Sequence, residues 1–167
     1  HFREPLAPAP RDDIPADYLT TIDAWRTDEG KGAYTAYAPT KALPDSAAQR
    51  QVLHLLRASH RGVIIAGQLD GPTEALSAAR LAGALGWPLL PDITSGLRLG
   101  TPRQALAYYD QLLQSAAFQS RFAPDCVLHI GGPVVSKRRT QYLADFAPRP
   151  YIRIAPHPFR ADPAHRV

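Results

Sequence analysis

The sequence predicts an α/β fold: a Rossmann-like three-layer domain with a parallel sheet of at least four strands, preceded by a Pro-rich linker and a short helix. Two observations lead to this prediction. Short apolar runs bounded by glycine or proline, typical of strands buried on both faces, alternate with amphipathic segments. Strands that alternate with helices of about 10–15 residues form right-handed β-α-β units around a parallel sheet. With 167 residues, 45% of them hydrophobic, the chain is long enough for one domain with a sizeable core.

Proline marks both ends of the chain. Of 17 prolines, six lie in the first 44 residues and five in the last 20. We therefore expect a linker at residues 1–44 and the Rossmann-like domain at 45–167. Tyr18, Leu19, Ile22 and Trp25 have helical spacing and predict one short helix over 17–26. Because the sequence contains no methionine, we expect a domain cut from a longer or processed chain.

The first half of the domain contains two predicted helices and two predicted strands. Asp45 is a suitable N-cap for a helix to about Ser59, whose apolar stripe is Val52, Leu53, Leu55 and Leu56. The glycine-flanked apolar run 62–67 predicts a buried strand. Segment 73–85 predicts a helix that ends at Gly86, and 87–90 predicts a second strand.

The second half repeats this alternation. Segment 102–118 predicts a helix, with a possible break, whose inward side chains are Leu106, Tyr109, Leu112, Leu113 and Ala116. Residues 125–130 predict a third buried strand, in which we expect His129 to be a core histidine and Cys126 an inert apolar side chain. A helix over 136–146 and a strand over 151–154 follow.

In such folds, ligands bind at the loops that follow the strands, here 67–72, 91–99, 131–139 and 155–160. The loop beginning Gly67-Gln68-Leu69-Asp70-Gly71 lacks the Gly-x-Gly-x-x-Gly spacing that lets backbone approach a pyrophosphate, so we expect no dinucleotide there. No histidine pair has metal-ligand spacing, and no catalytic constellation is visible.

The loop at 131–139 is the candidate functional loop. It opens with two glycines and delivers Lys137, Arg138 and Arg139 to the first turn of a helix, where cations oppose the helix dipole at about a few tenths of a kcal/mol each. That pattern is consistent with binding of a carboxylate or phosphate, but cations that are solvated or paired with a neighbouring domain would give the same sequence. From residue 137 onward there are seven basic and two acidic residues, a local charge that favours an anion site or an acidic partner surface over nucleic-acid binding.

Other features of the sequence indicate where in the cell the protein is expected. The sequence has no apolar run of about 18 residues, so we expect no membrane span. Its N-terminus lacks the layout of a signal peptide, and its one cysteine favours a reducing cytoplasm.

Four segments resemble, in order and spacing, the central domain of the 2-succinyl-5-enolpyruvyl-6-hydroxy-3-cyclohexene-1-carboxylate (SEPHCHC) synthases, thiamine-diphosphate enzymes of menaquinone and phylloquinone synthesis. The segments are Phe-Arg-Glu-Pro-Leu at 2–6, the run 62–67 with 85–98, the stretch 128–141 with its Gly-Gly-Pro and Ser-Lys-Arg, and Ala-Asp-Pro-Ala-His at 161–165. The resemblance covers essentially the whole chain.

This resemblance implies that the full enzyme decarboxylates 2-oxoglutarate on thiamine diphosphate, with Mg²⁺ holding the diphosphate, and adds the resulting carbanion to isochorismate. It implies partners as well: flanking thiamine-diphosphate-binding domains of the same chain, and further copies in a dimer or tetramer. We expect no cofactor in this fragment, and no activity from it alone.

The resemblance also implies roles for particular residues. Lys137 and Arg138 stand where the family has a Lys-Arg pair that binds anionic substrate, whereas Arg139 is expected on the surface. Some members bind a dihydroxynaphthoate as feedback at a basic cage. In the family, one arginine of this cage falls near the position of Gly132, so the sequence departs from the pattern there. Arg153 and Arg160 are the candidates to replace that arginine.

Two alternatives remain open from the sequence. One is a stand-alone anion-binding or regulatory α/β module. The other is the central domain of a different thiamine-diphosphate enzyme, such as a relative of acetolactate synthase, which would predict a cofactor-like site in this domain.

Overall fold

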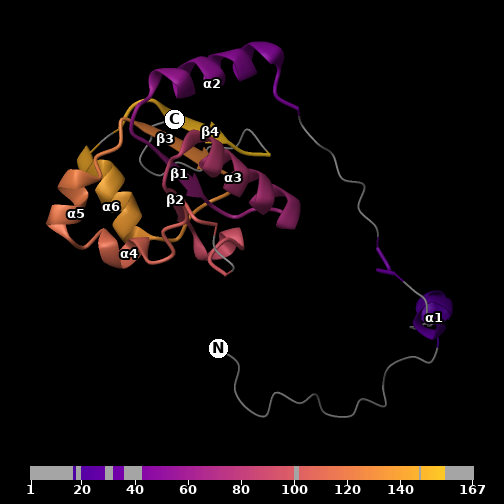
Figure 1. Cartoon of the computed structure of the whole chain (residues 1–167). Coiled ribbons are helices and arrows are strands. Elements are labelled where there is room, and N and C mark those ends of the chain that lie inside the picture. Colours follow the sequence, from indigo (N-terminus) through magenta and orange to yellow (C-terminus); the bar gives the residue numbers. More distant parts are fainter. Residues whose placement is uncertain are drawn as a thin grey trace. The chain divides into compact units, whose positions relative to one another are not determined.

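The computed structural model describes residues 17, 20–28, 32–35, 43–99, 102–146 and 148–156. The chain divides between Thr40 and Lys41 into two units. In the first unit, α1 (Thr20–Thr27) confirms the short helix predicted there, although Tyr18 and Leu19 lie outside the described residues (Figure 1). The Trp25 indole Nε1 donates to the Gly32 carbonyl at 3.1 Å, and its ring lies edge-on to Tyr34 at 5.3 Å.

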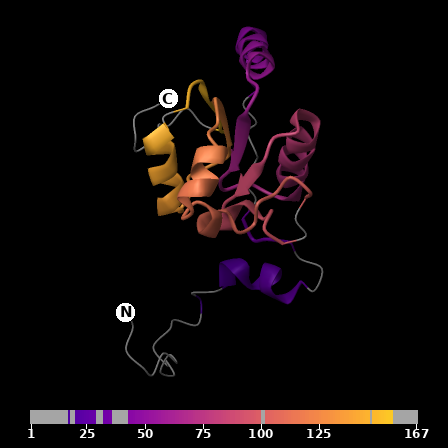
Figure 2. The ribbon, with the colours of Figure 1, turned by 60° about the vertical axis from the view of Figure 1, so that its left-hand side comes forward.

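The second unit contains a parallel sheet between two helical layers (Figure 2). The strands are β1 (Gly62–Ala66), β2 (Leu89–Pro91), β3 (Cys126–Ile130) and β4 (Tyr151–Ile154), in the spatial order β2-β1-β3-β4. The helices are α2 (Ser46–Ala58), α3 (Pro72–Leu85), the 3₁₀ turn η1 (Ile93–Ser95), α4 (Tyr109–Leu112), α5 (Ala116–Arg121) and α6 (Lys137–Phe146). The predicted α/β class with a four-stranded parallel sheet is confirmed.

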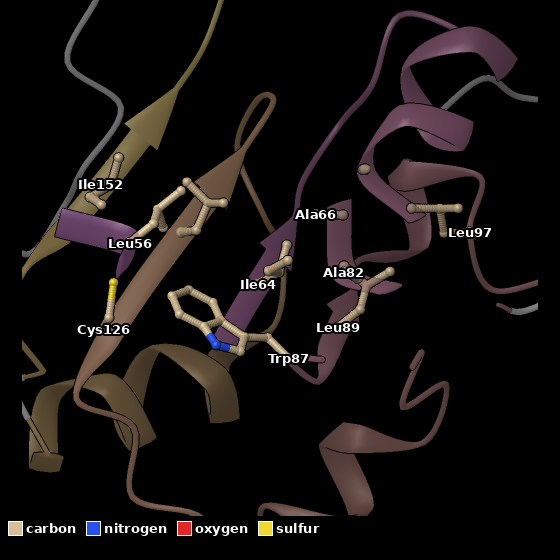
Figure 3. Close-up of a cluster of buried hydrophobic side chains, with 11 residues drawn as sticks. Leu56, Ile64, Ala66, Ala82, Trp87, Leu89, Leu97, Cys126 and Ile152 are labelled. Atoms are coloured by element: carbon tan, nitrogen blue, oxygen red, sulfur yellow. The ribbon is translucent and has the colours of Figure 1, made fainter. Parts of the chain in front are cut away.

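Alternation of side chains along the strands creates the two cores of this domain. Ile64 of β1 and Leu89 of β2 pack with α2 and α3 on one face, together with Leu56 and Trp87 (Figure 3). Leu90 of β2 and Val127 of β3 pack on the other face with α4 and α6. Because both faces are covered, β1 and β2 are apolar throughout, as the sequence predicted, whereas β3 and β4 also contain His129 and Arg153.

Trp87 explains why glycine begins β1. The indole is 6% exposed, and a Cβ added at Gly62 would lie 2.2 Å from its ring. Trp87 was expected within the second strand, but β2 begins at Leu89. The Trp87 ring thus fills the space beside the start of β1, and β2 begins after Pro88.

The helix predicted over 102–118 is wrong in its first part. Residues 104–106 run along β2, where Leu89 N–H donates to the Gln104 carbonyl at 2.9 Å and Leu106 N–H donates to the Leu89 carbonyl at 2.8 Å. Since β2 is an edge strand, its outer backbone groups need such partners. Helix begins only at Tyr109, and Leu112 and Ala116, expected inside, are exposed.

Helix ends follow the sequence more closely. Asp45 caps α2 by accepting from Ala47 N–H at 2.6 Å and Ala48 N–H at 2.9 Å. Gly86, with φ of 65°, ends α3 in the left-handed conformation. Leu53, expected in the apolar stripe of α2, is 51% exposed. Among the described residues, no helix has the length and apolar character needed to cross a membrane.

Candidate functional site

Two loops meet at the carboxyl ends of β1 and β3, where a Rossmann fold has its topological switch point. Gly132 N–H donates to the Gln68 carbonyl at 2.8 Å, and a Cβ added at Gly131 (φ of 85°) would lie 2.3 Å from that same oxygen. A Cβ at Gly67 would lie 2.1 Å from the Gly132 carbonyl oxygen. The loops therefore fill the crevice in which related folds bind a pyrophosphate, and their glycines serve this close backbone approach.

His129 fixes the direction of the second loop. Its ring is 4% exposed, with Nε2 3.0 Å from the Gly132 carbonyl and Nδ1 3.0 Å from the Tyr151 hydroxyl. A carbonyl only accepts, so Nε2 donates, and in the neutral ring Nδ1 accepts from Tyr151. The prediction of a satisfied core histidine is confirmed. Cys126 is likewise buried, and burial raises the pKa of its thiol.

Asp92 ties the loop after β2 to the loop after β3. Its carboxylate is buried, with the residue 1% exposed. Oδ1 accepts from Thr94 N–H at 3.1 Å and from the Thr94 hydroxyl at 2.8 Å, while Oδ2 accepts from Val135 N–H at 2.9 Å. Sequence reasoning missed this residue, because the contact with Val135 spans 43 positions.

A second polar connection joins the same two regions. Asp110 accepts from the Ser136 hydroxyl and from Arg98 Nη2, the latter at 3.2 Å. The neighbouring Tyr109 has a raised phenol pKa, first because of burial and then because of the carboxylates of Asp110 and Asp92. The loop after β3 is thus held by contacts with the loops that follow β1 and β2 and with the segment at 98–110.

This loop leads directly into the predicted anion-binding pair. Lys137 and Arg138 are exposed in the first turn of α6, at the carboxyl end of the sheet. Within the described part of the chain, neither side chain forms an ion pair. Two exposed cations that form no ion pair with any described carboxylate can bind the carboxylate or phosphate of another molecule.

The other candidate arginines differ from one another. Arg139, expected on the surface, is only 9% exposed, because it shares the buried face of α6 with Tyr142 and Leu143. Arg153 lies on β4 beside His129 of β3, and its Nε and Nη2 atoms are buried with no hydrogen-bond partner among the described residues. Arg160 lies outside the described residues.

Comparison with known families identifies the domain. A family model described as the middle domain of thiamine pyrophosphate enzymes matches residues 16–167. The chain belongs to this family.

Among curated proteins, this middle domain is similar to 2-succinyl-5-enolpyruvyl-6-hydroxy-3-cyclohexene-1-carboxylate synthases. It is 44% identical over 98% of its length to the one from Rubrobacter xylanophilus, and 39% identical over 99% to the one from Salinibacter ruber. The Chlorobium luteolum protein is 34% identical over 99% of the chain. The chain spans only 27–28% of the length of these relatives.

Thiamine diphosphate and Mg²⁺, which the family implies, do not fit the described residues of the middle domain. No three His, Cys, Asp or Glu side chains among them are grouped as metal ligands. The crevice at the switch point is filled by backbone. These residues therefore supply no chemical step through the cofactor.

Proposed function

We propose that this middle domain is part of a SEPHCHC synthase, a transferase that decarboxylates 2-oxoglutarate and joins the product to isochorismate in menaquinone synthesis. The 44% identity over 98% of the chain supports this proposal most strongly. Thiamine diphosphate and Mg²⁺ would be bound by other domains of the full-length protein, where they would supply the carbanion chemistry.

Within that enzyme, Lys137 and Arg138 bind a carboxylate of the substrate. Both 2-oxoglutarate and isochorismate are dicarboxylates, and a guanidinium can bind a carboxylate through two parallel hydrogen bonds. The pair is exposed at the end of the sheet where Rossmann-like domains bind ligands. No internal carboxylate of the described residues has to be displaced when substrate enters.

The flanking domains are the first proposed partners, and further copies of the chain in a dimer or tetramer are the second. Exposed Leu76, Ile93 and Leu99 lie on α3, on η1 and in the loop after η1, all near this end of the sheet, and give a partner domain an apolar surface. We place the enzyme in the cytoplasm, in keeping with the single unpaired cysteine.

The test is the double substitution Lys137→Ala, Arg138→Ala in the full-length protein. Loss of charge-assisted hydrogen bonds of about 1.5–3 kcal/mol should raise KM for one dicarboxylate roughly ten- to a hundredfold. The matched control is Arg50→Ala, Arg57→Ala, which removes two exposed cations of α2. Unchanged steady-state kinetics in the Lys137, Arg138 variant would overturn the substrate-binding role.

A specific observation favours a second, regulatory anion site at Arg153. Within the described part of the chain, two guanidinium nitrogens of Arg153 are buried without acceptors, which costs about 1–3 kcal/mol each and which a bound anion would offset. We propose that an aromatic hydroxycarboxylate such as a dihydroxynaphthoate binds there, with Arg160 as a second ligand group.

Arg153→Met should then raise the inhibition constant for dihydroxynaphthoate about tenfold or more, because the charge-assisted contact is lost while side-chain length is kept. Substrate KM should stay within about twofold of wild type. Arg149→Met, at an exposed arginine just before β4, serves as the control. Equal inhibition of both variants and of wild type would exclude this site.

A further inference from the structure

Ser136 occupies an unusual position between two contacts. It is the N-cap of α6: its Oγ accepts from Arg139 N–H at 3.0 Å, and its carbonyl accepts from Thr140 N–H at 3.2 Å. The single hydroxyl proton is donated to Asp110 Oδ1. The residue is 9% exposed, so both functions of the hydroxyl are used inside the protein.

Asp110 is in turn held from the end of β2. Its Oδ2 lies 3.2 Å from Arg98 Nη2, and Arg98 Nε donates to the Pro91 carbonyl at 3.2 Å. The same guanidinium lies 5.4 Å from the centre of the Tyr109 ring. A continuous series of polar contacts therefore runs from Pro91, the last residue of β2, to the first turn of α6.

Apolar packing does not hold this part of the loop. The Val135 side chain is 71% exposed, yet its N–H donates to the buried Asp92 carboxylate. Two neighbouring residues, Val135 and Ser136, are thus fixed by carboxylates from a different part of the chain. Such directional contacts define the position of the backbone more narrowly than the burial of an exposed valine could.

The charges of α6 explain why the contact between Asp110 and Ser136 matters. The helix begins Lys-Arg-Arg and has no acidic residue in its first turn, so its own sequence disfavours the start of the helix. A carboxylate joined to the N-cap hydroxyl offsets that effect. The first turn is therefore kept where the two exposed cations need it, although an uncharged first turn would form more easily.

We propose that Ser136, held by Asp110, is a positioning residue that sets Lys137 and Arg138 against the substrate carboxylate. This inference rests on the proposed function, because it assigns Ser136 an effect only through the cation pair. Bidentate recognition tolerates misplacement of about half an ångström, so loss of the anchor weakens binding even where the helix still forms.

The experiment compares Ser136→Ala and Ser136→Thr in the full-length enzyme. Ser136→Ala should raise KM for the acidic substrate about tenfold, with kcat within about threefold of wild type. Ser136→Thr keeps the hydroxyl and should restore KM to within about threefold. Ser77→Ala, which removes an exposed hydroxyl bonded to the Thr73 carbonyl in α3, is the matched control and should change neither constant.

Combination with the Lys137→Ala, Arg138→Ala pair separates positioning from general destabilisation. If Ser136 acts through the two cations, Ser136→Ala adds less than about twofold to KM in the background that lacks them. A full tenfold rise in that background overturns the inference, and so does an unchanged KM in the Ser136→Ala single variant.

Amide hydrogen exchange gives a readout that does not depend on turnover. The Arg139 amide should exchange about tenfold faster in Ser136→Ala than in wild type, while amides of α3 are unchanged. Failure of the proposed function looks different from failure of the inference. An unaffected KM in the Lys137, Arg138 variant overturns both, whereas a raised KM there with a normal Ser136→Ala enzyme overturns positioning alone.

Discussion

The two ends of the sheet are stabilised by different means. At the carboxyl end, two loops are joined by backbone hydrogen bonds, and two aspartates, Asp92 and Asp110, connect segments far apart in the sequence. At the amino end, Asp125 accepts from the N–H groups of His60 and Arg61 at 2.9 and 3.0 Å, and a group of aromatic side chains packs together beside these contacts.

Those aromatic residues lie around Tyr142. Its ring centre is 4.9 Å from that of Phe146 and 6.1 Å from that of Phe122, which stacks on it. Apolar packing of this kind tolerates small shifts, whereas a network of buried hydrogen bonds fixes the relative position of its members. The difference places the exposed cations at the end where position is determined most strictly.

Of the substitutions considered, Gly131→Ala should lower the stability of the carboxyl end of the sheet most. The added Cβ would meet the Gln68 carbonyl oxygen at a φ of 85°, so we expect a loss of about 3–5 kcal/mol in the free energy of unfolding from strain and overpacking together. Urea unfolding of the chain measures it.

Gly83→Ala is the control for that change. Gly83 lies on an exposed part of α3, where a Cβ would approach only Gln104 Nε2, at 3.8 Å. The alanine should stabilise the chain by about 0.5–1 kcal/mol, because glycine is unfavourable inside a helix. A loss below about 1 kcal/mol in Gly131→Ala would show that the two loops are not as closely packed as described.

Tyr142→Phe should have a smaller effect that depends on pH. The Tyr142 hydroxyl is buried and has no hydrogen-bond partner in the described parts of the chain, so its removal should leave stability at pH 7 unchanged or raise it by up to about 1 kcal/mol. Burial raises the pKa of this phenol to about 12, against a small opposite effect of Arg61.

The sign of the alkaline effect follows from this raised pKa. Between pH 10 and pH 12 the folded chain keeps the Tyr142 proton while the unfolded chain releases it, so wild type loses about 1–3 kcal/mol over that range. Tyr142→Phe should lack this part of the loss when unfolding is measured at pH 7, 10 and 11.5. Parallel curves for the two proteins would contradict it.

Local patterns in the sequence predicted much of the fold. Glycine-flanked apolar runs, the Asp45 cap and Gly86 depend on neighbouring residues, and they placed the strands and helix ends within a few positions. The segment 104–106 was wrongly predicted as helix because its partner is Leu89, an edge position that no local pattern reveals.

The candidate site was predicted only in part, for the same physical reason. Lys137 and Arg138 are recognisable as a charge run after a strand, and their exposed positions agree with that interpretation. Arg139 was misjudged because the buried face of α6 is set by Tyr142 and Leu143 packing on the sheet. Asp92 and Asp110 act across the fold, and acidic residues in a loop carry no signal of such distant partners.

The indole packed against Gly62 also makes the molecule easy to observe. The chain has two tryptophans, Trp87 in the second unit and Trp25 in the first. Trp87 is 6% exposed among apolar side chains, whereas Trp25 is only partly covered and bonded to Gly32. Fluorescence of a Trp25→Phe protein would therefore come from the sheet domain alone, and its shift to longer wavelength would follow the opening of that core without a label.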